Sequence, residues 1–313
     1  STIRNLELLE PLFAGESRES TLIHVLDKTS TGMGGRLLRH RLLNPSCRRD
    51  EIEARLDAIA ELVAATIFRS ELRKALGGIQ DLERLLAKLT LGTGTPRDLL
   101  ALGRSLAQLP GLAKLTAAAE TQALRYEADP VEDVAREILS AIADEPPVNL
   151  ADGGTIRDGF DSRLDELRDI SRNSRQYIAA IESRERAATG IQSLKIRFNN
   201  VFGYYIEVSK TNLALVPAAY ERKQTLANAE RFTTPELKEL EAKVLSAEEK
   251  ILSLEREIFQ GIRSSAAGHA SRIKSAAAAV AELDVAASLA HIAVENRYRR
   301  PRFSDSGEMR IEA

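Results

Sequence analysis

The sequence predicts a mainly α-helical fold: a discontinuous helical core with two long antiparallel helices that carry a small inserted β-rich module at their tip. Three observations support this prediction. Apolar residues recur at helical spacing along most of the 313 residues, two long segments follow a coiled-coil pattern, and the segment 191–234 between them switches to strand periodicity. The composition agrees, because Ala, Leu, Glu and Arg dominate while aromatic residues make up only 4%.

Short amphipathic helices are expected through the first half of the chain. The apolar residues of segment 52–63 step by four, three and four, which is one face of a helix. An earlier helix should end at Pro45, and further helices are expected over 81–90 and 96–109. The Pro- and Gly-rich segment 146–154 indicates a loop before the long helices.

The two long helices are expected from about Phe160 to Ala188 and from Pro235 onward. Their apolar positions alternate at steps of three and four, which is the seam of a coiled coil. Two such helices joined by one insert pack most simply antiparallel, with the insert at the tip. The expected seam is Phe160, Leu164, Leu167, Ser171, Ser174, Ile178 and Ile181 against Leu237, Leu240, Val244, Ala247, Ile251, Leu254 and Ile258.

Two serines interrupt the first seam. Ser171 and Ser174 bury little apolar surface, so the packing at the middle of this helix should be weak. One hypothesis is that this point flexes and tunes the motion of the insert. The alternative is ordinary variation on a solvent-facing side.

The insert should contain a β-hairpin and a third strand. Apolar residues alternate with polar ones over 194–198 and again over 204–208, and residues 199–203 separate the two runs as a five-residue loop. A third strand is expected near 220–225. The insert holds six of the fourteen Phe and Tyr residues, and six Lys or Arg against three Asp or Glu, whereas the whole chain has a net charge of −2. Any nucleic-acid site must therefore be a local patch.

The sequence gives little support to an enzyme, a cofactor-binding protein or a membrane protein. The dipeptide Gly-Lys never occurs, so no phosphate-binding P-loop is present, and the four His are not paired at metal-ligand spacing. The glycines of 32–35 lack the third Gly of a dinucleotide fingerprint, so we interpret them as tight packing at a helix start. Most carboxylates lie among Lys and Arg on helix faces, as solvated pairs do. Cys47 is the single cysteine, which fits a reducing compartment, and no apolar run approaches the ~20 residues of a membrane span.

The charge of the insert favours contact with a nucleic-acid backbone. Lys and Arg neutralise phosphates without sequence preference, and Asn side chains can position a backbone. The alternative is a solvated sheet face, since the excess of positive charge is modest. A second basic cluster at 297–302 surrounds Pro301, where a boundary or linker is the simpler interpretation.

Several ordered motifs resemble the MutS family of DNA mismatch repair proteins, and together they cover almost the whole chain. The longest is Phe-Gly-Tyr-Tyr-Ile-Glu-Val at 202–208. The others are Thr21-Leu22, Leu26–Thr29, Met33–Arg36, Asn44-Pro45, Asp81–Arg84, Pro96–Leu99, Arg222–Leu226, Asn228–Phe232, Pro235–Lys238 and Ser304–Gly307. The resemblance implies a piece of a longer protein, with the family's mismatch-reading and connector domains before Ser1.

The resemblance divides the chain into four segments. Residues 1–190 would be the first part of the core and lever, 191–234 the DNA-gripping clamp, 235–303 the lever return helix and second part of the core, and 304–313 the start of a truncated ATPase domain. No cofactor is then expected in this chain, whereas the full-length family member would use ATP and Mg. The implied partners are double-stranded DNA, containing a mismatch for the full-length protein, a second copy in a homodimer and a MutL-type protein. The implied location is the cytoplasm, at the nucleoid, with no membrane.

The resemblance also nominates DNA-contacting residues. Family clamps meet the DNA backbone through the hairpin loop and the turn before the return helix, which here implies Asn199, Asn200 and Asn228. Electrostatics adds Lys195, Arg222 and Lys223. Two departures from the family pattern are Arg41, where many relatives carry Trp, and Ala227, where many carry Lys. The competing hypothesis is a purely structural coiled-coil arm whose insert is a protein–protein hinge, as in chromosome-organising proteins.

Overall fold

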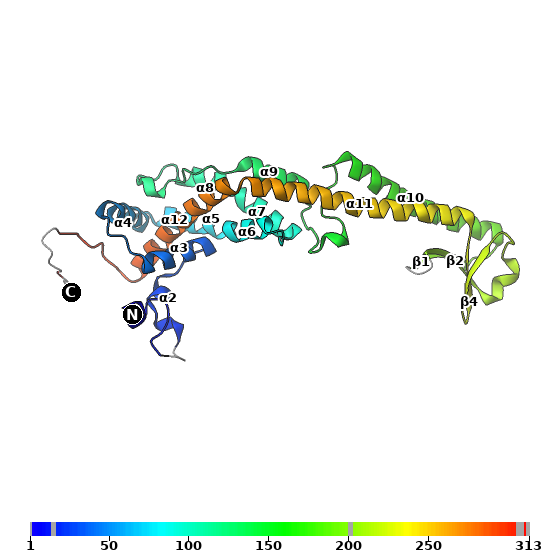
Figure 1. Cartoon of the computed structure of the whole chain (residues 1–313), viewed down its shortest axis with the longest axis horizontal. Helices are drawn as coiled ribbons and strands as arrows, with labels where there is room; N and C mark the ends of the chain where they lie inside the picture. Colours follow the sequence, from blue (N-terminus) through cyan, green and yellow to red (C-terminus); the bar gives the residue numbers. More distant parts are fainter. Residues whose placement is uncertain (1, 14–16, 200–202, 305–309, 311–313) are drawn as a thin grey trace. The chain divides into compact units, whose positions relative to one another are not determined.

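The structure, a computed structural model, describes residues 2–13, 17–199, 203–304 and 310, except for the side chains of residues 2, 18, 174 and 175. Two compact units make up the chain, and each is described by itself. The first unit joins Ser1–Ile142 to Gly261–Ala313, and the second is Ala143–Gln260. The expected fold class is confirmed, because helices dominate and one small antiparallel sheet is inserted between the two longest of them (Figure 1). The expected segment boundaries at 190/191 and 234/235 stay a prediction about domains.

The first unit is built of helices packed around one long central helix, α12 (Ala270–Glu295), which contacts α3, α4, α5 and α6. Its surrounding helices are α1 (Thr2–Asn5), α2 (Leu22–Leu26), α3 (Gly32–Leu43), α4 (Arg49–Ala64), α5 (Thr66–Gly77), α6 (Leu82–Thr90), α7 (Pro96–Leu106), α8 (Leu109–Thr116) and α9 (Glu132–Ala141). Short 3-10 turns are η1 (Arg18–Ser20) and η2 (Gln122–Leu124).

Helix α12 qualifies the expectation that no segment could span a membrane. It is 26 residues long, and an 18-residue stretch of it has a mean hydropathy of 1.6, so length and composition alone would allow a crossing. More than half of that stretch is buried inside the structure, on several sides of the helix. Its many alanines allow neighbouring helices to approach closely, which fits the central core helix of a helical domain.

A buried carboxylate caps helix α3. Asp284 of α12 accepts hydrogen bonds from the backbone N–H of Ser30 and Thr31, at 2.9 and 2.8 Å, and from the Thr31 hydroxyl at 2.7 Å. A Cβ at Gly34 would overlap this carboxylate, so only glycine fits there. The glycines of 32–35 therefore pack a helix start, as expected from the sequence.

The second unit contains an antiparallel helix pair, α10 (Ser162–Thr189) and the first part of α11 (Pro235–Gly268). Near one end of the pair, Arg168 meets Glu255 at 2.6 Å. Near the other end, Ile181 packs against Leu240 and Val244. The 3-10 turn η3 (Leu150–Asp152) lies in the loop before α10. The expected antiparallel pairing is confirmed.

The seam of α11 departs from the expected positions beyond Ala247. Leu254 and Ile258 are only half-buried, whereas Glu255 and Phe259 are fully buried. The reason at Glu255 is polar: its carboxylate accepts hydrogen bonds from the N–H groups of Gly154 and Thr155 at 3.2 and 3.1 Å, besides pairing with Arg168.

The middle of α10 is sparsely packed. Ser171 is half-buried and lines a cavity of about 520 Å³ together with Ile251 and the loop that precedes α10. The side chain of Ser174 lies outside the described part of the chain. The hypothesis that the two serines tune flexing stays a prediction.

The sheet has four antiparallel strands in the order β1-β2-β4-β3. These are β1 (Lys195–Asn199), β2 (Gly203–Ser209), β3 (Glu221–Thr225) and β4 (Ala229–Thr233), with the 3-10 turn η4 (Lys210–Leu215) after β2. The third strand is confirmed, and β4 was not foreseen. The expected five-residue loop was too long, because Asn199 and Gly203 are already paired in the ladder. The inner face packs on a core formed by Ile191, Leu194, Ile206, Val208, Phe232 and Leu237.

Candidate nucleic-acid interface

Strand alternation gives the sheet a second face, turned away from this core. Ile206 and Val208 belong to the inner core, so their neighbours Tyr205 and Glu207 lie on the opposite side. The ladder extends this side across the other strands through the pairs formed by Tyr205 and Glu207. We call it the outer face; it comprises Lys195, Arg197, Asn199, Tyr205, Glu207, Gln224 and Arg231.

Three cations surround one carboxylate on the outer face. Lys195 lies directly across the ladder from Glu207. The Nε atoms of Arg197 and Arg231 lie 3.9 and 3.5 Å from the two carboxylate oxygens of Glu207. Around Glu207, three positive charges against one negative charge leave this part of the outer face cationic, although Glu207 offsets part of the positive potential.

Arg231 is held in place by an aromatic ring. Its guanidinium carbon lies 4.2 Å from the centroid of the Tyr205 ring, and its Nη1 donates a hydrogen bond of 2.8 Å to Gln224 Oε1. The stacking contact holds a planar cation against the sheet instead of leaving it to sample many rotamers. Sequence reasoning did not nominate Arg197 and Arg231, although Arg197 alternates with Lys195 along one strand.

The asparagines nominated from the sequence lie in two different places. Asn199 ends β1, paired with Gly203, and Asn200 lies outside the described residues. Asn228 is exposed in the turn between β3 and β4, where its carbonyl accepts a hydrogen bond from the Lys210 N–H at 3.1 Å. Because Ser209 pairs with Ala229 at the far end of β2, Asn199 and Asn228 mark opposite ends of the sheet. The seven residues of β2 separate them by roughly 20 Å.

The cations nominated from the sequence differ in their surroundings. Lys195 is exposed, and no salt bridge to it is found within the described ranges. Arg222 Nε lies 2.8 Å from the nearly buried carboxylate of Glu230. Lys223 is mostly buried, where its Nζ donates to the Tyr204 carbonyl at 3.5 Å and lies 3.8 Å from Glu241. The charges of Arg222 and Lys223 are thus met largely by carboxylates of the chain itself.

Helix α11 fixes the hairpin end of the sheet. Glu241 accepts a hydrogen bond of 3.0 Å from the Tyr204 N–H. Gly203 has a φ of +67°, and a Cβ there would overlap the Glu241 carboxylate, so glycine is required for both reasons. The start of β2, and with it the end of β1, is therefore tied to the long helix rather than being a free loop.

Known proteins match this chain over most of its length. The family model described as MutS domain III matches residues 1–290. The chain is 64% identical over its whole length to the DNA mismatch repair protein MutS of Solibacter usitatus, of which it covers 37%. It is 48% identical to that of Geobacillus kaustophilus, with 96% of the chain and 34% of the relative covered, and 46% identical to that of Pelotomaculum thermopropionicum, with 100% and 36% covered. The chain thus spans somewhat more than a third of the length of these relatives. It belongs to the MutS family, as a chain that carries domain III.

Proposed function

We propose that this chain is the part of a DNA mismatch repair protein that holds duplex DNA through its phosphate backbone. We further propose that the two long helices transmit whether DNA is bound. The observation that carries the proposal is the cationic outer face, with Lys195, Arg197 and Arg231 around a single carboxylate. The process comes from the relatives to which the chain is similar, which are DNA mismatch repair proteins.

The chemistry of the outer face favours binding without sequence preference. Lys and Arg that neutralise phosphates release counterions, and this gain is the same for every sequence. Asn199 and Asn228 are neutral donors at the two ends of the sheet, so they would position a backbone without adding to the salt dependence. Asn200 stays a proposed contact beside Asn199. Arg222 and Lys223 contribute less, because Glu230 and Glu241 already face them.

The proposed transmission runs along α10 and α11, which we equate with the family's lever. Buried contacts at both ends of the pair, Arg168 with Glu255 and Ile181 with Leu240, would make the pair move as one body. In the whole protein it would connect the clamp to an ATPase that uses ATP and Mg. Two such arms of a homodimer would close around a mismatch-containing duplex, in the cytoplasm at the nucleoid, and signal to a MutL-type partner.

Fluorescence anisotropy with labelled duplexes over a salt series tests the proposal. A single chain should bind weakly, with a Kd of about 10⁻⁴–10⁻⁶ M, and a log–log salt slope of roughly −2 to −3 from two or three neutralised phosphates. Matched and mismatched duplexes should bind alike, because backbone contacts carry no direct sequence information.

Two sets of variants distinguish charged contacts to phosphate from neutral contacts to the DNA backbone. Replacing the exposed Lys195 and Arg197 with Ala should flatten the slope by about 2, whereas Asn228→Ala should weaken binding at an unchanged slope. A clear mismatch preference of this chain, or a steep slope that survives the double replacement, would place the DNA surface elsewhere. Retention on heparin that salt abolishes is expected, whereas no retention at low salt would favour the protein–protein hinge instead.

A further inference from the structure

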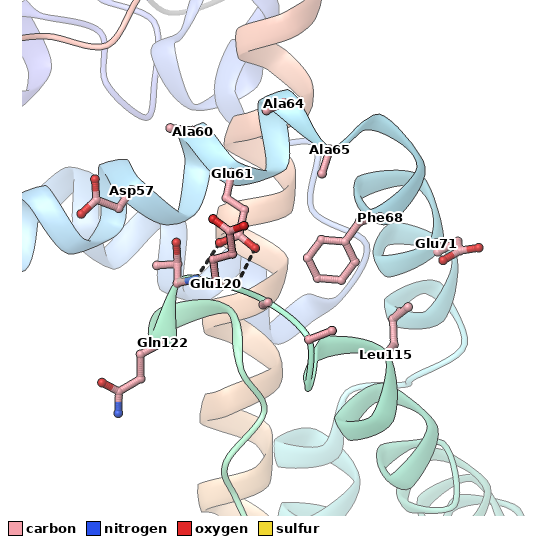
Figure 2. Close-up of a pocket in the computed structure, with 13 residues that line it drawn as sticks. Asp57, Ala60, Glu61, Ala64, Ala65, Phe68, Glu71, Leu115, Glu120 and Gln122 are labelled. Carbon is pink, nitrogen blue, oxygen red and sulfur yellow. Dashed lines mark hydrogen bonds between the residues drawn. The ribbon is translucent and has the colours of Figure 1, made fainter.

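The first unit carries a groove of about 1060 Å³ on its surface. Helix α4 forms one wall, the start of α5 forms the end, and the turn that joins α8 to η2 forms the other wall (Figure 2). A hydrogen-bonded bridge sets the width of this groove. Glu61 of α4 accepts the N–H groups of Glu120 and Thr121 at 2.9 and 2.7 Å, which ties the two walls together. The groove is therefore preformed.

The floor of the groove is apolar and shallow. The Phe68 ring points into the space between the two walls, and Leu115 lies across from it (Figure 2). The remaining apolar lining is alanine: Ala60, Ala64, Ala65, Ala118 and Ala119. Short side chains let another backbone approach closely. Next to Phe68, Ile67 is 76% exposed, which is a large aliphatic side chain left in water at the start of α5.

The rim of the groove is acidic. Four carboxylates line it, from Asp57, Glu61, Glu71 and Glu120, and no Lys, Arg or His lines it within the described part of the chain. Two neighbouring cations offset part of this charge: Arg300 pairs with Asp57, and Arg125 donates to the Ala119 carbonyl at 2.9 Å and lowers the pKa of Glu61. Burial alone would raise the pKa of Glu61, but the hydrogen bonds from Thr121 and Glu120 outweigh it and lower that pKa. The bridging carboxylate therefore stays ionised, and its charge remains in the groove.

We propose that this groove docks a basic amphipathic helix of a partner protein. A helix is about 10 Å across and rises about 5.4 Å per turn, so a volume of this size accommodates roughly two turns. Its apolar stripe would cover Phe68 and Leu115, as in helix-in-groove recognition, while Lys or Arg on its flanks would meet Glu71 and Glu120. The same charges repel a phosphate backbone, so the occupant is not nucleic acid. This inference is independent of the DNA-binding proposal.

The test is binding of a synthetic helix to the full chain. The probe is a fluorescein-labelled peptide of about 18 residues, five helical turns, with Leu along one stripe and Lys on both flanks. Two control peptides carry Glu in place of Lys, or the same residues scrambled so that the stripe is lost. The charge-reversal variant is Glu71→Lys with Glu120→Lys. Its matched control is Glu248→Lys with Glu249→Lys, two exposed carboxylates on α11 of the second unit.

The peptide with the Lys flanks should bind, and the groove double reversal should weaken it about tenfold while the matched reversal leaves it within about twofold. A photo-cross-linking residue placed at Ala64, which is exposed and lines the groove, should capture the peptide, and one at the exposed Ile170 of the second unit should not. Equal binding of the Glu peptide or the scrambled peptide would overturn the proposal, as would an affinity unchanged by the groove reversal. So would equal capture of the peptide at Ile170. Circular dichroism of each variant verifies that it is folded.

Discussion

Replacing Glu255 with Leu tests whether one buried ion pair joins the long helices to the loop that precedes them. The Glu255 carboxylate is fully buried, and it holds Arg168 at 2.6 Å and the N–H groups of Gly154 and Thr155 at 3.2 and 3.1 Å. Leu removes all three contacts at once. It leaves a guanidinium that is only 12% exposed without its buried partner, and two amides without an acceptor.

Breaking one side of a buried pair typically costs about 3–5 kcal/mol. Arg168 would retain Asp158, at 2.6 Å, and the Ile156 carbonyl, at 2.8 Å, so the lower end, about 3 kcal/mol, is expected. The matched control is Glu239→Leu on the same helix, since Glu239 and its partner Lys243 are both largely exposed. That change should stay within about 0.5 kcal/mol.

Urea unfolding followed by circular dichroism gives the free energies, and hydrogen exchange at the amides of Gly154 and Thr155 gives the local effect. Adding Arg168→Met to Glu255→Leu should recover part of the loss, because the uncompensated charge is then gone. If Glu255→Leu costs no more than Glu239→Leu, or if exchange at the two amides is unchanged, the pair does not hold this joint.

Three further predictions concern single side chains. Glu207→Gln removes the carboxylate that faces Arg197 and Arg231. DNA binding measured by anisotropy should therefore tighten about threefold at low salt, and the salt slope should steepen by up to about 0.9. The control Glu239→Gln should change neither the affinity nor the slope. Arg41 lines a mostly apolar cavity of about 270 Å³, and its buried Nε has no acceptor among the described residues. Its guanidinium pairs with Glu282, but that carboxylate is half-exposed, so losing the pair costs little. Arg41→Trp should therefore raise the free energy of unfolding by about 1–2 kcal/mol, and a lower melting temperature would contradict this. Burial raises the pKa of Asp284 above its ordinary 3.8 despite the hydrogen bonds from Ser30 and Thr31, so the native state holds that proton more tightly, and its contribution to stability falls as pH rises through the raised pKa. The free energy of unfolding of the wild type minus that of Asp284→Asn should therefore fall as the pH rises from ~4 through the raised pKa in urea titrations, and an increase of this difference with pH would contradict the sign.

The sequence was most informative where local periodicity decides the structure. The short helices, the antiparallel pair and the first two strands follow from apolar spacing, whereas strand β3 has no apolar residue. Strand β4 was not predicted, because Glu230 and Arg231 interrupt the alternation of apolar and polar residues. Glu230 is nearly buried on the inner side, where an apolar residue would be expected. The buried position of Glu255 was equally hidden, since its partner amides lie about 100 residues earlier in the chain.

The candidate interface depended on contacts that no local pattern contains. Arg197 and Arg231 meet the same carboxylate only because β4 pairs with β2. From the sequence, Lys223 is predicted to be a cation available to DNA. In the structure, Glu241 of the following helix lies beside it. Charge counts along the sequence therefore identified the insert as basic, but could not say which of its charges are already matched within the chain.

The two anchored ends of the helix pair constrain how this arm could change in length during evolution. On α10, Arg168 contacts Glu255 of α11, and Ile181 contacts Leu240 of α11. The distance between the two contacts must therefore be the same along both helices. One inserted residue in either helix would rotate everything beyond it by about 100° and shift it by about 1.5 Å, which separates one anchor from its partner. Viable insertions or deletions should therefore come in matched pairs, one in each helix, and in whole heptads that restore the rotational phase. Aligned relatives should show gaps that are correlated between these two stretches.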